Sequence, residues 1–93
     1  MCGENLSAAG EIVFDFGDWK FLLHPDSAVR GHAMLVAARH VQNFTDLTDS
    51  EAQQYARVHK VVERALLDVT RTDRAILLKL GIAVPHLHIH IYP

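Results

Sequence analysis

One stretch decides how the rest of the chain is interpreted: residues 85–92, which read Pro-His-Leu-His-Ile-His-Ile-Tyr. Successive side chains of a β-strand point to opposite faces of its sheet. A strand here has imidazoles on one face and aliphatic groups on the other: His86, His88 and His90 against Leu87, Ile89 and Ile91. We expect the aliphatic face to pack against a helix, while the opposite face displays three imidazoles in a row.

Upstream of this stretch, the sequence predicts three strands, one helix and a fourth strand. The strands are expected at residues 12–16, 19–24, 32–37 and 75–80, with 86–92 as the fifth. The strands come in runs, with no repeated strand–helix–strand pattern. The predicted fold class is therefore α+β: an antiparallel sheet of about five strands with one main helix packed on a face.

The helix is predicted from a capping box and a periodic apolar pattern. The Thr48 hydroxyl can accept a hydrogen bond from the backbone N–H of Glu51, and the Glu51 side chain can reach back. Three- and four-residue steps then predict one buried stripe over about five turns: Ala52, Tyr55, His59, Val62, Leu66 and Val69. On this pattern His59 is expected to pack in the core rather than to bind a ligand.

The composition describes one small domain without obvious polyanion or membrane partners. The chain has 93 residues, of which 22% are charged, and its formal net charge is -2 with histidine neutral. It has no run of Lys and Arg to bind nucleic acid, and no apolar stretch near the ~20 residues of a membrane span. The single cysteine, Cys2, favours a reducing, cytoplasmic location. We expect a flexible segment at residues 1–10 and a single domain over 11–93.

A row of imidazoles is compatible with two chemistries. Zinc is one, because neutral imidazole is a common ligand. At ~3.3 Å per residue, the Cα atoms of His86 and His90 lie about 13 Å apart, so only neighbours such as His86 and His88 can share an ion. A third ligand would have to come from His40 or His24. Phosphate chemistry is the other: one ring can attack phosphorus while its neighbours donate hydrogen bonds to oxygens or to the leaving group.

The sequence resembles the histidine-triad (HIT) family. The family's His-x-His-x-His, with hydrophobic residues between, is present at residues 86–90. Residues 31–40, Gly-His-Ala-Met-Leu-Val-Ala-Ala-Arg-His, resemble its Gly-His-x-x-(apolar)-x-Pro-x-x-His element. The likeness covers residues 19–92. It implies a HIT-like fold, a homodimer, and transfer of nucleotidyl groups without a metal cofactor.

The resemblance also implies a role for each histidine of the site. His88 would be the nucleophile that takes the nucleotidyl group as a covalent phosphoramidate. His86 would orient it through its backbone carbonyl, and His90 would bind the phosphate and assist the leaving group. His40 matches the family's fourth site histidine. His32 is expected to hydrogen-bond the end of the sheet rather than to take part in catalysis.

The second strand and the following turn are expected to contact the nucleoside of a purine nucleotide or dinucleotide. Phe21, Leu22 and Leu23 are the candidates for packing near the base, and Asp26 lies in the turn. His24 stands where the family usually has Asp or Asn to bind the ribose hydroxyls. This substitution leaves the nucleoside preference open.

Three functions remain open on the sequence. The first is a hydrolase or transferase acting on nucleoside phosphoramidates or dinucleoside polyphosphates through a nucleotidyl-histidine intermediate. The second is a nucleotide-binding module with weak or no catalysis, because Ile82 stands where a compact form of the family has Asn. A lost phosphate donor costs on the order of 100-fold in rate. The third is a metal-binding protein that uses the His-x-His strand. Family members usually continue beyond the position of Pro93, so truncation at the C-terminus is a further hypothesis.

Overall fold

The computed structural model describes residues 11–23, 30–79 and 86–93. Its strands are β1 (Glu11–Asp15), β2 (Trp19–Leu23), β3 (Ala33–Ala37), β4 (Ile76–Leu78) and β5 (His88–Tyr92). A short 3-10 turn, η2 (Phe44–Asp46), precedes the one long helix of the described residues, α2 (Asp49–Thr70).

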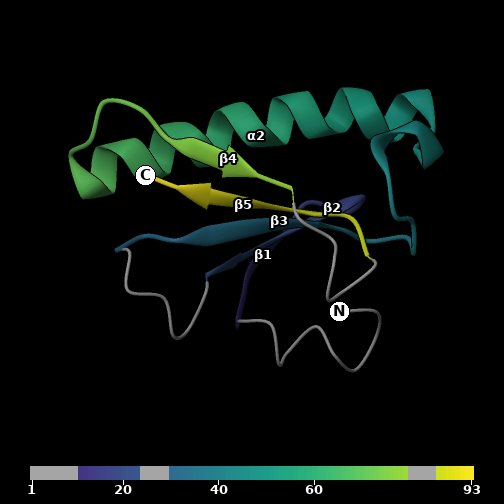
Figure 1. Ribbon diagram of the computed structural model, residues 1–93, viewed down its shortest axis with the longest axis horizontal. Helices are drawn as coiled ribbons and strands as arrows, with labels where there is room; N and C mark the ends of the chain where they lie inside the picture. Colours follow the sequence, from purple (N-terminus) through teal and green to yellow (C-terminus); the bar gives the residue numbers. More distant parts are fainter. Residues whose placement is uncertain (1–10, 24–29, 80–85) are drawn as a thin grey trace.

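The five strands form one antiparallel sheet in the order β1-β2-β3-β5-β4. Helix α2 runs along one face of this sheet (Figure 1). The predicted α+β class, with about five antiparallel strands and one main helix on a face, is therefore confirmed. Within the described ranges, no helix is long and apolar enough to cross a bilayer.

The predicted strand boundaries are correct to within about two residues. The boundary difference that affects the site is at the start of the last strand. The strand was expected from His86, but β5 begins at His88 and His86 lies in a bend before it. The ladder with β3 reaches only Val36 opposite His88. Beyond that point the backbone of Leu87 accepts from Ala37 at 3.1 Å and donates to the Val41 carbonyl at 2.7 Å, which anchors the bend.

The core lies between α2 and the sheet, with Trp19 fully buried in it. The indole N–H of Trp19 donates to the Glu51 carbonyl at 3.0 Å, and its ring packs against Tyr55 with centroids 4.8 Å apart. This buried hydrogen bond fixes the first turn of α2 over β2. The remaining buried members of the cluster are Ala33, Leu35, Ala37, Val41, Val58, Val62, Leu66, Leu87, Ile89 and Ile91.

The buried stripe of α2 differs in part from the predicted one. Val62 and Leu66 are buried as expected, but Ala52 and Val69 are exposed and Val58 is buried instead. Residues three and four apart lie side by side on a helix, so periodicity alone does not choose between adjacent flanks of one stripe. Contact with the sheet selects the flank that carries Val58.

The expected core histidine of α2 lies at the edge of the core. His59 is half-buried, and its Nδ1 is 2.8 Å from the Tyr55 hydroxyl. Its Nε2 lies 3.6 Å from a carboxylate oxygen of Glu63, one turn further along α2. His59 therefore has a polar structural role, on the opposite side of the sheet from the triad.

The capping box of α2 is confirmed. The backbone N–H of Glu51 donates to the Thr48 hydroxyl at 3.2 Å, and that of Thr48 donates to the Glu51 carboxylate at 2.8 Å. Arg39 adds two hydrogen bonds to the same carboxylate, at 2.8 and 3.1 Å. Arg39 and the Thr48 N–H lower the pKa of Glu51 from 4.5 to about 2. The start of α2 is thus tied to the segment that follows β3.

Candidate active site

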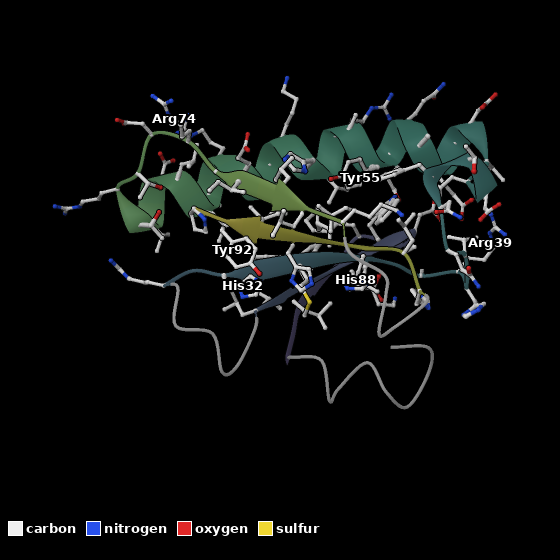
Figure 2. The ribbon with its side chains drawn as sticks, in the orientation of Figure 1. His32, Arg39, Tyr55, Arg74, His88 and Tyr92 are labelled. Atoms are coloured by element: carbon white, nitrogen blue, oxygen red, sulfur yellow. The ribbon has the colours of Figure 1, made fainter. Side chains whose placement is uncertain are left out.

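Two triad histidines, His88 and His90, lie on the sheet face that α2 does not cover. Pairing of β5 with β3 sets His88 opposite Val36 and His90 opposite Met34. Directly paired residues point to the same side of a sheet. Val36 and Met34 form a buried cluster with Leu22, separate from the core under α2. Figure 2 shows His32 and His88 on this side of the sheet, away from the helix.

His88 is held in one tautomer. Its Nδ1 lies 2.6 Å from the backbone carbonyl oxygen of His86, and the side chain is buried, with 6% of the residue exposed. A carbonyl only accepts, so Nδ1 must carry the proton and the lone pair of the neutral ring is on Nε2. The contact that the family resemblance implied between His88 and the His86 carbonyl is therefore present.

His86 is anchored to the end of β3 rather than aimed across the sheet. Its Nε2 donates to the Ala37 carbonyl at 2.6 Å, and the residue is buried. The exposed His40 stands edge-on to the His86 ring, with centroids 5.3 Å apart and planes at 76°. The structure thus brings together His40 and the triad, with His40 at the outer end of the row.

His90 is hydrogen-bonded to a histidine that the sequence analysis assigned to a structural role. Nε2 of His32 and Nδ1 of His90 lie 2.9 Å apart. The contact arises because β3 and β5 are antiparallel neighbours with Ala33 opposite Ile91, so His32 stands beside the end of β5. His32 does bond at the end of the sheet, as expected, but its partner is a triad member. The cluster therefore contains a fifth imidazole.

The predicted base-contacting residues are divided between the two faces of the sheet. Phe21 and Leu23 line an apolar cavity of about 270 Å³. Its other walls come mainly from the C-terminal half of α2 and the start of β3: Arg30, Gly31, Ala65, Leu66, Val69 and Thr70. Leu22 lies on the histidine face. Phe21 and Leu23 are thus not brought to the triad. His24, Asp26 and Ile82 lie outside the described residues.

One lysine extends the histidine face toward β1. Lys20 pairs with Val36, which in turn pairs with His88, so the three side chains form one row across the sheet. The Lys20 ammonium contacts the Asp15 carboxylate at 2.8 Å. This hydrogen bond lowers the pKa of Asp15. The backbones of Lys20 and His88 are two strands apart, about 10 Å at normal strand spacing, and the ammonium bonds on the β1 side of β2.

Two of the triad nitrogens are already bonded to backbone carbonyls and so are not positioned toward one metal ion. Among the residues with described positions, no three His, Cys, Asp or Glu side chains converge as ligands. Nε2 of His86 and Nδ1 of His88 both bond to backbone carbonyls. Such bonds hold the rings in series along the strand rather than around one point.

Comparisons with known proteins support the same fold. The HIT domain profile matches residues 5–93. A histidine triad protein from Bradyrhizobium japonicum has a TM-score of 0.87 and 27% identity, covering 99% of this chain and 69% of that one. The NitFhit protein of C. elegans has a TM-score of 0.80 and 28% identity, and the match covers 88% of this chain and 21% of that protein. A hypothetical histidine triad nucleotide-binding protein from Sulfolobus tokodaii has a TM-score of 0.78 and 25% identity, and the match covers 90% of this chain and 60% of that protein.

The family match spans nearly the whole chain, although each of these three proteins is longer. The HIT family as a whole consists of nucleotide-binding hydrolases and transferases. From the profile match, the shared fold and the histidine cluster on the uncovered sheet face, we conclude that this chain belongs to the HIT domain family.

Proposed function

We propose that the protein is a hydrolase or transferase that acts on nucleoside phosphoramidates or dinucleoside polyphosphates through a nucleotidyl group bound to His88. One observation carries this proposal: the hydrogen bond from His88 Nδ1 to the His86 carbonyl. It leaves the lone pair on Nε2, which is the state that a nucleophile needs.

The first step forms the covalent intermediate. The Nε2 lone pair of His88 attacks the α-phosphorus of the substrate, and a bond from nitrogen to phosphorus forms. The bond from phosphorus to the leaving group breaks, and its electron pair stays with the leaving group, which takes a proton from His90. The His88 ring becomes cationic because it keeps its Nδ1 proton. The His86 carbonyl, 2.6 Å from Nδ1, stabilises that charge.

The second step releases the nucleotide. A water molecule, or another acceptor in a transferase, attacks phosphorus and gives its proton to the now deprotonated His90. The phosphorus–nitrogen bond to His88 breaks, its electron pair returns to Nε2, and the nucleoside monophosphate leaves when water is the acceptor. The two histidines are adjacent on the same face, with ring centroids 5.0 Å apart, so both can reach one phosphoryl group.

The experiment is release of AMP from adenosine 5′-phosphoramidate in the presence of EDTA. We expect release by the native chain and at least a ~10³-fold loss in His88→Ala, because the variant has no nucleophile. His59→Ala is the matched control, since it removes an imidazole from the opposite side of the sheet. It should retain near-native activity.

The outcomes separate the functions. Release that persists in His88→Ala would contradict the covalent role of His88. AMP binding by a folded native chain without any release would favour the nucleotide-binding module that the Ile82 substitution suggests. Release that EDTA abolishes would favour a metal site.

We further propose a homodimer formed along β4. This strand is one of the two edges of the sheet, and its three aliphatic side chains are exposed: Ile76 at 63%, Leu77 at 47% and Leu78 at 40%. An edge strand with exposed apolar side chains is a template for pairing with another chain. A second copy would cover these side chains and satisfy the outer backbone groups of β4.

A further inference from the structure

The last aromatic residue of β5 packs on the fifth histidine of the cluster. The rings of Tyr92 and His32 are stacked, with centroids 4.1 Å apart and planes at 19°. Tyr92 lies two residues beyond His90 and thus on the same face of β5. Figure 2 shows Tyr92 and His32 close together on this part of the sheet. Tyr92 therefore contacts the site, with its closer ring contact to His32 and a wider one, at 6.1 Å between centroids, to His90.

The hydrogen bond between His32 and His90 restricts the protons of the pair to two arrangements, with either ring as the donor. Of two imidazoles joined through one nitrogen each, one must donate and the other accept. If Nε2 of His32 donates, Nδ1 of His90 accepts and the proton of the His90 ring is on its Nε2. His88 is held in the other tautomer, with its proton on Nδ1. The His88 ring would then present a lone pair to phosphorus, and the adjacent His90 ring would present a proton to the leaving group.

The orientation of the His32 ring controls this hydrogen bond. Rotation about the terminal torsion of histidine is broad, and a hydrogen bond weakens steeply when its angle falls. An aromatic ring stacked at 4.1 Å restricts that rotation more than an aliphatic side chain can, because it covers the whole face of the imidazole.

We propose that Tyr92 is a positioning residue: by stacking on His32 it maintains the hydrogen bond that leaves the proton of His90 on Nε2. The inference rests on the proposed function, in which His90 gives that proton to the leaving group. As it does so, a His32 imidazolium passes its Nε2 proton to Nδ1 of His90, and both rings end neutral. The proposal predicts that replacing Tyr92 lowers kcat more for a leaving group that needs a proton than for one that does not. An amine must be protonated as its bond to phosphorus breaks. A 4-nitrophenolate can leave with the electron pair alone.

The kinetic test compares two substrates in three forms of the full chain. For adenosine 5′-phosphoramidate we expect Tyr92→Leu to lower kcat by about 10- to 100-fold, within the range of general-acid effects. For the 4-nitrophenyl ester of AMP the loss should be less than ~3-fold, because no proton is transferred to the leaving group. Tyr92→Phe is the matched control and should be near native with both, since it keeps the stacked ring. Equal losses on both substrates, or none on the phosphoramidate, would overturn the proposal.

A second measurement does not require activity. Histidine side-chain nitrogen NMR of the native chain should find His90 protonated on Nε2 and His32 donating. Tyr92→Leu should give a mixture of His90 tautomers, and Tyr92→Phe should not. A native His90 protonated on Nδ1, or a tautomer unaffected by Tyr92→Leu, would overturn the proposal. A native chain inactive on both substrates would overturn the proposed enzyme instead, while the NMR result would still decide whether Tyr92 positions His32.

Discussion

At the scale of single residues, backbone carbonyls decide the tautomers of two buried histidines, His86 and His88. The Ala37 carbonyl accepts from His86, and the His86 carbonyl accepts from His88, both at 2.6 Å. These acceptors do not titrate, so they hold their imidazoles in one tautomer wherever the ring is neutral. A carboxylate partner would favour the imidazolium instead. The arrangement keeps the lone pair of His88 available for attack.

Gly31 is the residue whose replacement we expect to be most damaging beside the site. Its φ is +80°, and a Cβ there would lie 2.8 Å from Cγ2 of Thr70 and 3.0 Å from Cγ of Pro93. Thr70 has little freedom to yield, because its hydroxyl donates to the Leu66 carbonyl at 2.7 Å. Gly31→Ala should lower the free energy of unfolding by about 2–4 kcal/mol, measured by urea unfolding with Trp19 fluorescence.

Gly17→Ala is the control for this prediction. Gly17 also has a positive φ, +98°, but a Cβ there would meet no atom within 4 Å. Only backbone strain should appear, about 1–2 kcal/mol. Equal losses in the two variants would show that the contacts of Gly31 with Thr70 and Pro93 contribute nothing.

At the scale of elements, the start of α2 combines a local signal with a tertiary contact. Thr48 and Glu51 form the capping box from residues three apart, which any isolated helix could use. Arg39 comes from beyond the end of β3 and makes a bidentate pair with Glu51. This pair ties α2 to the sheet and holds the Glu51 carboxylate in its charged form.

Glu51 should make stability depend on pH in the acid range. Its pKa is lowered to about 2 in the folded chain, against an ordinary 4.5. A lowered carboxyl pKa gives stability that is fully present above the ordinary value and is lost as pH falls through the folded value. Native chain should exceed Glu51→Gln in unfolding free energy at pH 5 and above, and the difference should shrink toward pH 2. Urea unfolding at several pH values measures it.

Asp68→Asn provides the control for Glu51→Gln. Asp68 pairs with Arg64 at 3.0 Å, but both side chains are largely exposed, and such pairs contribute ~0–1 kcal/mol. A difference between native chain and Glu51→Gln that stays constant from pH 5 to pH 2 would contradict the assigned role of the Glu51 charge.

At the scale of the whole molecule, the two faces of the sheet have different roles: one packs in the core and the other carries the site. Helix α2 covers one face and completes the core there (Figure 1), while the other face carries His88, His90 and His32. The strands connect the two faces, because alternate residues of β5 point into the core and toward the histidine cluster. The edge at β4 is where a second copy is proposed to add.

The proposed dimer gives a prediction at this scale. Leu77→Lys places a charge on the β4 edge, on the face opposite His90, and should convert a dimer to a monomer in size-exclusion chromatography with light scattering. Val69→Lys is the matched control: it also replaces an exposed aliphatic side chain, but beside β2, away from β4. A native chain that is monomeric at every concentration, or a Leu77→Lys variant that stays dimeric, would contradict the β4 interface.

Sequence alone was sufficient for the features that depend on near neighbours. The alternation of residues 86–92 predicted the two faces of the last strand, and the capping box predicted where α2 begins. The fold class followed from the order of strands and helix, and the resemblance at residues 31–40 and 86–90 indicated the family that the HIT domain profile confirms. These signals are readable because strand alternation and helix capping act over two to four residues.

Tertiary structure decided which distant residues meet. His32 and His90 are 58 residues apart in sequence, and they bond because the sheet order sets β3 beside β5 in one register. The register of β2 with β3 turns Phe21 away from the triad, and the β3–β5 ladder ends before His86. Strand order and register are chosen by packing of the entire sheet against α2, which no short stretch encodes. The histidine pattern was therefore evident in the sequence, and the resemblance implied the partner of His88, but the partners of His86 and His90 came only from the tertiary structure.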